Sequence, residues 1–279
     1  QTFVPPYADD FENGQGSWTT GGQTLLFELG VPTGNVINTA SSPTNAWVTD
    51  LDAPYVNNSQ AYLFSPYFDF QDLLNTSLNF KHWYSTENSW DGGRLDYSTD
   101  GGNTWTVLGA FLDSTWYNDD VITSSTLPGW TGASNAWIDA YYPLDLFNGI
   151  QGLVQFRFEY TSDGSVIGGD GWGIDDFEIN VPIQHSAATQ DIVVSPSNFF
   201  ILPQASPVSV DVQNTGEQDL TSVLVTLEID NNNIVTDSIH FGVPLQKGQI
   251  STHTFSVPWQ ADPGQHTICA YTSNPNVRL

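Results

Sequence analysis

Basic residues and cysteine are scarce in this chain of 279 residues. Only 5 residues are Lys or Arg against 31 Asp and Glu, which gives a formal net charge of -26 at pH 7. A field of this sign repels phosphate backbones and anionic membrane surfaces, so we expect no nucleic acid among the partners. Cys269 is the single cysteine, which excludes a disulfide within the chain, and its place in an alternating run predicts a buried structural thiol.

Long apolar runs and helical periodicity are also missing. No run can form a transmembrane helix, so we expect no direct membrane insertion. No signal peptide begins at Gln1: either an export signal has been removed, or the chain is a piece of a longer multidomain protein. Charged residues reach only 13%, as do aromatics, which excludes a disordered acidic tail. The composition is typical of an extracellular or cell-surface bacterial protein stabilised by packing and cations.

Short alternating runs separated by turn residues predict an all-β fold. Leu78, Phe80, His82 and Tyr84 share one face of a strand, and similar runs recur along the whole chain. Nine of the ten Trp precede Ile183, after which Val, Ile and Thr dominate. We therefore predict a jelly-roll β-sandwich over residues 1–184 and an immunoglobulin-like β-sandwich over residues 185–279.

The segment Ser98–Trp105 is the clearest local motif. Asp100 can accept hydrogen bonds from turn amides, Gly101 and Gly102 permit positive φ, and Trp105 can pack below the turn. The spacing matches the Asp box, best known from sialidase propellers. Because the turn accounts for every residue of the motif, we interpret Asp100 as structural and not catalytic.

A series of short motifs occurs in a set order along the first domain. They are Asp10-Phe11-Glu12-Asn13, Asn45-Ala46-Trp47-Val48-Thr49, Tyr62-Leu63-Phe64-Ser65-Pro66, His82-Trp83-Tyr84-Ser85-Thr86-Glu87, Asp91-Gly92-Gly93, the Asp box and Gly171-Trp172-Gly173-Ile174-Asp175-Asp176-Phe177. In that order they resemble the jelly-roll domains of the MAM, cleaved-adhesin and immune-inhibitor-A type, over about residues 7–182. Such domains are abundant in secreted and surface proteins of Bacteroidetes.

The second domain resembles a bacterial immunoglobulin-like module of the CARDB type. The resemblance lies in Asp191-Ile192-Val193-Val194, Val212-Gln213-Asn214-Thr215-Gly216 and Gly264-Gln265-His266-Thr267-Ile268. Together the two resemblances imply a noncatalytic module, tethered to an enzyme or repeated in an adhesin. Such modules often carry structural calcium, and the resemblance implies that this one does as well.

Two acidic segments are candidates for a Ca²⁺ site. A strand would place the carboxylates of Asp10 and Glu12 on one face, with Phe11 in the core, and the last strand would supply Asp175 and Asp176. First and last strands of a jelly roll commonly lie side by side, which would bring these acids together. Clustered acids without basic partners repel, and a cation held by hard oxygen ligands removes the repulsion. The alternative is that these acids are solvated charges or turn caps.

A second cation loop is a weaker candidate. Glu87 and Asp91 flank a turn that ends in Gly92 and Gly93, and Asp170 lies in another glycine-rich loop. Hydrogen bonds from Asx caps explain the Glu87–Gly93 turn equally well.

Aromatic residues in predicted loops form a candidate sugar-binding platform, because flat aromatic faces stack on sugar C–H surfaces. They are Trp90, Trp116, Tyr117, Trp130, Trp137, Tyr141 and Tyr142. The alternative is packing under long loops. Five other indoles are predicted to lie in the core: Trp18, Trp47, Trp83, Trp105 and Trp172.

Catalytic patterns are missing from the sequence. There is no G-x-S-x-G elbow and no H-E-x-x-H zinc motif, and His82 is predicted to be a core histidine. We therefore predict no enzyme activity, and a calcium-stabilised extracellular adhesion or binding module of a larger surface or secreted protein. Polysaccharide, glycoprotein or another surface protein would be its partner. The alternatives are a carbohydrate-binding module that targets a secreted hydrolase, and the accessory domains of a secreted metalloprotease.

Overall fold

The computed structural model describes residues 1–23, 27–113, 116–165, 169–195, 205–260 and 264–276, and it divides into two compact units, Gln1–Val181 and Pro182–Leu279. The division falls within a few residues of the predicted boundary at 184. Strands dominate both units, and the one helix of the described residues is a short 3₁₀ turn, Asp145–Phe147. The all-β prediction is confirmed. None of the described helices is long and apolar enough to cross a membrane.

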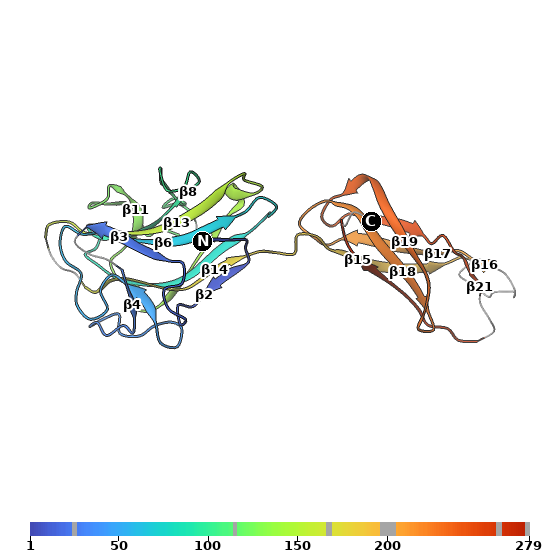
Figure 1. Cartoon of the computed structure of the whole chain (residues 1–279), viewed down its shortest axis with the longest axis horizontal. Coiled ribbons are helices and arrows are strands. Elements are labelled where there is room, and N and C mark those ends of the chain that lie inside the picture. The colour runs from blue at the N-terminus through green and yellow to red at the C-terminus, as the bar shows by residue number, and fades with distance from the viewer. Residues whose placement is uncertain (24–26, 114–115, 166–168, 196–204, 261–263, 277–279) are drawn as a thin grey trace. The chain divides into compact units, whose positions relative to one another are not determined.

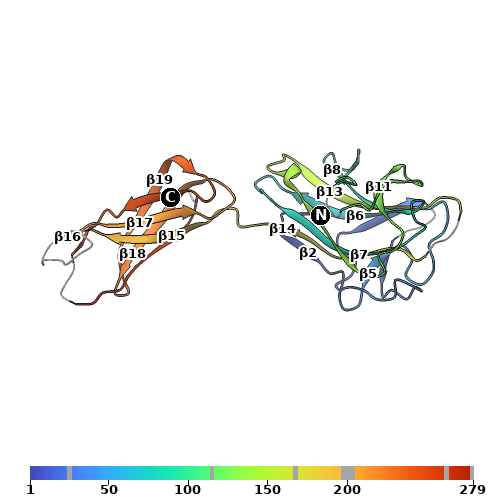
Figure 2. The same cartoon turned by 180° about the vertical axis from the view of Figure 1, so that it is seen from behind.

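The first unit is a sandwich of two sheets (Figures 1 and 2). The eight-stranded sheet has the order β1 (Thr2–Phe3), β6 (Gln60–Asp69), β13 (Leu153–Thr161), β8 (Gly92–Ser98), β11 (Leu127–Thr131) and β10 (Asp119–Ile122), with β3 (Thr19–Gln23) on β6 and β9 (Thr106–Val107) on β8. The six-stranded sheet has the order β12 (Ile138–Pro143), β7 (Ser77–Ser85), β14 (Gly171–Asn180), β5 (Ala46–Val48) and β4 (Glu28–Gly30), with β2 (Tyr7–Asp9) on β14.

Alternating side chains of both sheets fill the space between them. Strand β7 turns Leu78, Phe80, His82 and Tyr84 inward, as the sequence predicts, and β13 contributes four more buried residues, Val154, Phe156, Phe158 and Tyr160. Trp18, Trp47 and Trp172 belong to the same core, which confirms their predicted burial. Trp83 is only half-buried, because it lies on the outer face of β7 beside Trp137.

The Asp box forms the predicted turn between β8 and β9. Asp100 accepts hydrogen bonds from the Thr104 amide at 2.9 Å and from the Ser98 hydroxyl at 2.8 Å. These and the Thr104 hydroxyl lower the pKa of Asp100 to about 2, with the Thr104 side chain as the largest cause. Trp105 was expected in the core. It lies instead outside the eight-stranded sheet, with its ring centroid 4.4 Å from the Arg157 guanidinium.

The second unit is a smaller sandwich with a core of its own. One sheet has the order β15 (Ala187–Val194), β17 (Val208–Asn214) and β20 (Ile250–Thr254), the other β19 (Asn232–Leu245), β18 (Leu220–Ile229) and β22 (Ile268–Ser273), and a short pair joins β16 (Ala205–Ser206) to β21 (Trp259–Gln260). The predicted valine and leucine stripes of β17 and β18 form this core. Cys269 is exposed on β22, so the prediction of a buried thiol is wrong, because its neighbours Ile268 and Ala270 are the ones that pack inward.

Candidate functional site

The first strand, β1, pairs with β6, whereas the second strand, β2, lies beside the last strand of the first unit, β14. Strand β2 pairs antiparallel with β14, with Asp9 opposite Phe177. The segment that follows β2 is a turn and not the expected strand, because Phe11 has a φ of 60°. Phe11 is nevertheless buried, and the turn carries Glu12 towards the loop of residues 41–45 and the Asp175 carboxylate.

The hydroxyl of Ser42 lies at the centre of a group of oxygen atoms. Its Oγ is 3.0 Å from the Asp10 carbonyl oxygen and 3.1 Å from Glu12 Oε1. The Asn45 carbonyl oxygen and both carboxylate oxygens of Asp175 also lie 3.1 Å away. A hydroxyl has one hydrogen to donate, so at most one of these contacts is a full hydrogen bond. The carboxylate oxygens of Glu12 and Asp175 accept backbone N–H groups as well.

The two carboxylates of this group are held differently. Asp175 is fully buried and accepts the amides of Ser41 and Ser42, each at 2.8 Å. Burial outweighs these bonds and raises its pKa to about 6. Glu12 accepts the amide of Asn45 at 2.6 Å, and this bond is the main cause of its lowered pKa.

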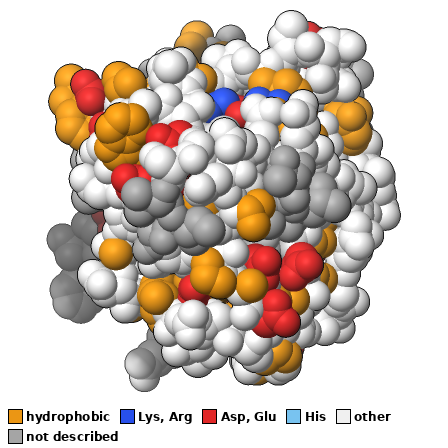
Figure 3. Space-filling view, turned by 90° about the vertical axis from the view of Figure 1, so that its left-hand side faces the viewer, with side chains coloured by type: hydrophobic (Ala, Val, Ile, Leu, Met, Phe, Trp, Pro, Cys, Tyr) orange, Lys and Arg blue, Asp and Glu red, His pale blue; other side chains and the backbone are white. Residues whose placement is uncertain are grey.

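No basic side chain compensates these charges. The first unit contains only Lys81, Arg94 and Arg157 as Lys or Arg, and the ion pairs of all three are made with Asp96, Asp139 and Glu159. Figure 3 views the first unit from its end and shows acidic side chains in several places but basic atoms in one small area beside an acid. Glu12 and Asp175 therefore have hydrogen-bond donors but no counter-charge among the described residues.

The kinds of oxygen in this group are ones that bind calcium. Ca²⁺ takes 6–8 oxygen ligands, which include carboxylates, backbone carbonyls and hydroxyls, at about 2.3–2.6 Å. The cluster around Ser42 offers six oxygens of these kinds from five residues: Asp10 O, Glu12 Oε1, Ser42 Oγ, Asn45 O and both Asp175 carboxylate oxygens. It offers no nitrogen or sulfur ligand, which disfavours zinc.

The predicted ligands take different parts in this cluster. Asp10 contributes its carbonyl, whereas its carboxylate accepts the Glu12 amide at 3.2 Å. Asp176 sits in a β-bulge with a φ of 47° and accepts the Ser41 hydroxyl, so it lies beside the cluster and not within it. Sequence reasoning missed Ser42 and Asn45. The polar turn Ser41-Ser42-Pro43-Thr44-Asn45 was the available signal, but only the fold shows that it reaches the acids.

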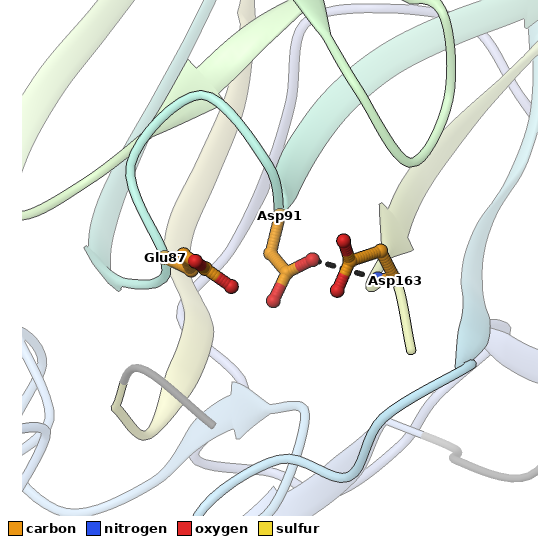
Figure 4. A group of neighbouring side chains, drawn as sticks. All are labelled: Glu87, Asp91 and Asp163. Carbon is orange, nitrogen blue, oxygen red and sulfur yellow. Dashed lines mark hydrogen bonds between the residues drawn. The ribbon is translucent and has the colours of Figure 1, made fainter. Parts of the chain in front are cut away.

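A second acidic cluster forms at the predicted Glu87–Gly93 loop. Glu87, Asp91 and Asp163 each offer a carboxylate oxygen, and these oxygens lie within 4.8 Å of one another. Figure 4 shows Glu87 and Asp163 on opposite sides of Asp91. Asp91 accepts the Tyr55 hydroxyl and the Asp163 amide, each at 2.7 Å. Asp163, two residues after the end of β13, was not predicted.

The charges of this second cluster also lack compensation. Glu87 Oε2 is a buried atom with no hydrogen-bond partner among the described residues. Burial raises the pKa of Glu87 and of Asp91, and the neighbouring carboxylates raise both further. Asp170 belongs to neither cluster, since its carboxylate accepts the amides of Val36 and Ile37.

Three of the seven aromatic residues proposed for sugar binding are buried. Trp116, Tyr117 and Trp130 are each at most 3% exposed and pack on one another in the core. Their polar atoms are satisfied there: Trp116 donates to the Leu108 carbonyl and Trp130 to the Trp116 carbonyl, while Tyr142 packs on Trp116. The predicted sugar-binding role of Trp116, Tyr117 and Trp130 is therefore wrong, because these three side chains pack in the hydrophobic core.

The other four proposed aromatics are at least partly accessible, and Tyr142 is half-buried. Tyr141 is 58% exposed and Trp90 is 47% exposed. Trp137 is half-buried: it lies against Gly173 on the outer face of β14 and donates to the Thr39 carbonyl at 2.8 Å.

Comparison with known proteins agrees with this architecture. Residues 56–191 match the family model described as immune inhibitor A-like, MAM domain, and residues 191–277 match the CARDB family model. The two matched regions follow each other in the order that the sequence motifs indicated. The Bacteroidetes origin stays a prediction.

One curated relative and two solved structures illustrate the similarity. Bacillopeptidase F of Bacillus subtilis is 28% identical over 170 residues, which are 61% of this chain and 10% of that protein. The K1 cleaved adhesin domain of Lys-gingipain from Porphyromonas gingivalis is 14% identical, with a TM-score of 0.40 over 63% of this chain and 98% of that one. The module TmCBM61, solved with β-1,4-galactotriose, is 14% identical, with a TM-score of 0.39 over 62% and 94%.

Proposed function

We propose that this chain is a noncatalytic, calcium-stabilised binding module of a larger extracellular protein. The observation that carries the proposal is the group of six oxygens around Ser42, which joins the N-terminal turn, the 41–45 loop and the last strand. A bound Ca²⁺ would supply the counter-charge that Glu12 and Asp175 lack and would connect the three segments.

The state of the acids supports a structural role. General acids and bases need to reach a substrate proton. Asp91 and Asp175 are the two aspartates with raised pKa in the described residues, yet both are fully buried and bonded to backbone amides. His82 is buried among aromatic rings and is equally out of reach.

The family matches and the curated relative support attachment to a larger protein. The chain spans a tenth of bacillopeptidase F, so the matched region is a minor part of that peptidase. Accessory domains beside a secreted peptidase are therefore one setting for this pair of domains. Attachment to a polysaccharide is the second, and the exposed Tyr141 favours it.

Calorimetric titration of Ca²⁺ into chelator-treated protein tests the calcium proposal. We expect binding by the wild type, and a loss of at least about tenfold in affinity for Glu12→Gln and Asp175→Asn, because each removes a charged ligand. Asp120→Asn is the matched control, since Asp120 is exposed and lies outside both clusters. A Glu87→Gln variant shows, through the stoichiometry, whether the second cluster also binds an ion. Wild type that takes up no Ca²⁺ would refute the proposal.

A further inference from the structure

The outer face of the six-stranded sheet carries an ordered set of polar and aromatic side chains. In the pairing of β12, β7 and β14, Tyr141 lies opposite Asn79, and Asn79 lies opposite Glu178. The next row in the same register contains Asp139, Lys81 and Asp175. Because side chains two residues apart on a strand share a face, both rows point away from the core. The inward residues between them, such as Phe80, are buried.

This face is hollowed where the last strand bulges. The pairing of β14 with β7 shifts register between Asp175 and Glu178, and Asp176 takes a positive φ there. A hollow of about 360 Å³ results, lined by Asn79, Phe80, Lys81, Asp139, Asp176 and Glu178. Its volume lies in the usual range for small-molecule sites, about 300–1,000 Å³.

We infer that this hollow binds a short neutral oligosaccharide, with Tyr141 as the stacking platform. The inference rests on the proposed function as a binding module, but it does not depend on the calcium ion. Tyr141 stands on edge strand β12 beside the hollow and is more than half exposed. An exposed aromatic ring next to convergent polar groups is the usual composition of a sugar site, in which the ring covers the C–H face of a pyranose.

The polar lining matches hydroxyl groups, which both donate and accept hydrogen bonds. Glu178 is exposed and can accept a hydroxyl proton, as can Asp176. The Lys81 ammonium and the Asn79 amide can donate to hydroxyl oxygens. Lys81 is already held by Asp139 at 2.6 Å, with its side chain 36% exposed, so it is oriented before a ligand arrives. The hollow therefore contains both hydrogen-bond donors and hydrogen-bond acceptors for sugar hydroxyl groups.

Charge selects against other ligands. Three carboxylates and a single ammonium line the hollow, so an anionic sugar or a phosphate would meet net repulsion. The whole chain, at -26, adds to that repulsion. A neutral oligosaccharide would not be repelled in this way.

Affinity electrophoresis tests this inference. The wild type is run in native gels that contain β-1,4-galactan, xylan or β-glucan, with polygalacturonate as an anionic comparison. We expect retardation by at least one neutral polymer and none by polygalacturonate. Tyr141→Ala should weaken the affinity about tenfold, and Tyr141→Phe should retain it, because the stacking face is preserved.

Trp90→Ala is the matched control, because Trp90 is the other exposed aromatic of the first unit proposed from the sequence. In each polymer gel, the mobility of the Trp90→Ala variant should equal that of the wild type. Retardation that is lost in Trp90→Ala and kept in Tyr141→Ala would overturn the site, as would retardation by polygalacturonate alone. If none of the neutral polymers retards the wild type, the inference is overturned. The calcium titration of the same preparations reports separately on the calcium-stabilised module.

Discussion

His82 is a histidine that the fold keeps neutral. Its ring is 1% exposed and packs 4.7 Å, between ring centroids, from Trp130. Its Nδ1 accepts the indole N–H of Trp172 at 3.3 Å, which requires an unprotonated nitrogen. Burial lowers its pKa to about 3, because the charged imidazolium would lose its hydration inside the sandwich.

This burial predicts acid sensitivity of the first unit. Between pH 6.5 and about 3 the unfolded chain binds a proton that the folded chain does not, so stability from this group falls as pH falls. From pH 6.5 to 4.5 the loss is about 2–3 kcal/mol in the free energy of unfolding. His82→Asn keeps a hydrogen-bond acceptor and does not titrate in this range. We therefore expect a flatter stability–pH curve in denaturant unfolding, whereas a curve parallel to the wild type would contradict the assignment.

At the scale of the element, the Asp-box turn shows how a local motif closes a hairpin. Asp100 binds the backbone amide and the hydroxyl of Thr104, and Gly101 and Gly102 take φ values of 76° and 88°. Trp105 then extends over the neighbouring strands and covers Arg157 from the solvent side. The conspicuous aspartate therefore serves the turn, as the sequence pattern indicates.

Removal of this side chain should destabilise the hairpin without affecting binding. Asp100→Ala leaves the Thr104 amide without its acceptor, and we expect the melting temperature of the first unit to fall by about 2–4 °C. Differential scanning calorimetry measures the shift, and Asp120→Ala serves as an exposed control. Unchanged Ca²⁺ affinity would accompany the fall. A drop in that affinity equal to that of Glu12→Gln would show that Asp100 has a role beyond the turn.

At the scale of the whole molecule, the two units have separate hydrophobic cores. The core of the first unit centres on aromatic residues, and that of the second centres on Val208, Val210 and Val223. The six oxygens of the candidate calcium site all belong to the first unit. Calcium should therefore act on one unit and leave the other unchanged.

Calorimetry with and without a chelator tests this separation. At a hundredfold excess over its dissociation constant, an ion that binds only the folded state adds about 2.7 kcal/mol. For a unit of this size that corresponds to a rise of about 5–10 °C in melting temperature. We expect two transitions, of which one shifts with calcium, and we expect Glu12→Gln to reduce that shift by about half or more. A shift of both transitions, or of neither, would contradict the placement of the ion.

Residue patterns by themselves determined much of this protein. Periodicity and turn chemistry depend on residues that are neighbours in the chain. They indicated the strand face from Leu78 to Tyr84, the Asp-box turn and the order of the two domains. That the acidic segments around Glu12 and Asp175 lie near each other was also predictable, because β2 and β14 are neighbours, but the turn at Phe11 was not.

The tertiary structure decided what depends on long-range pairing. It buried Trp116 and Trp130, exposed Tyr141, and brought Ser42, Asn45 and Asp163 to the acidic clusters. A backbone carbonyl ligand such as that of Asp10 has no residue type that marks it in a sequence. Both the oxygen group around Ser42 and the hollow beside Asp176 depend on how β14 bulges against β7, and such a register shift arises only when distant strands pack together.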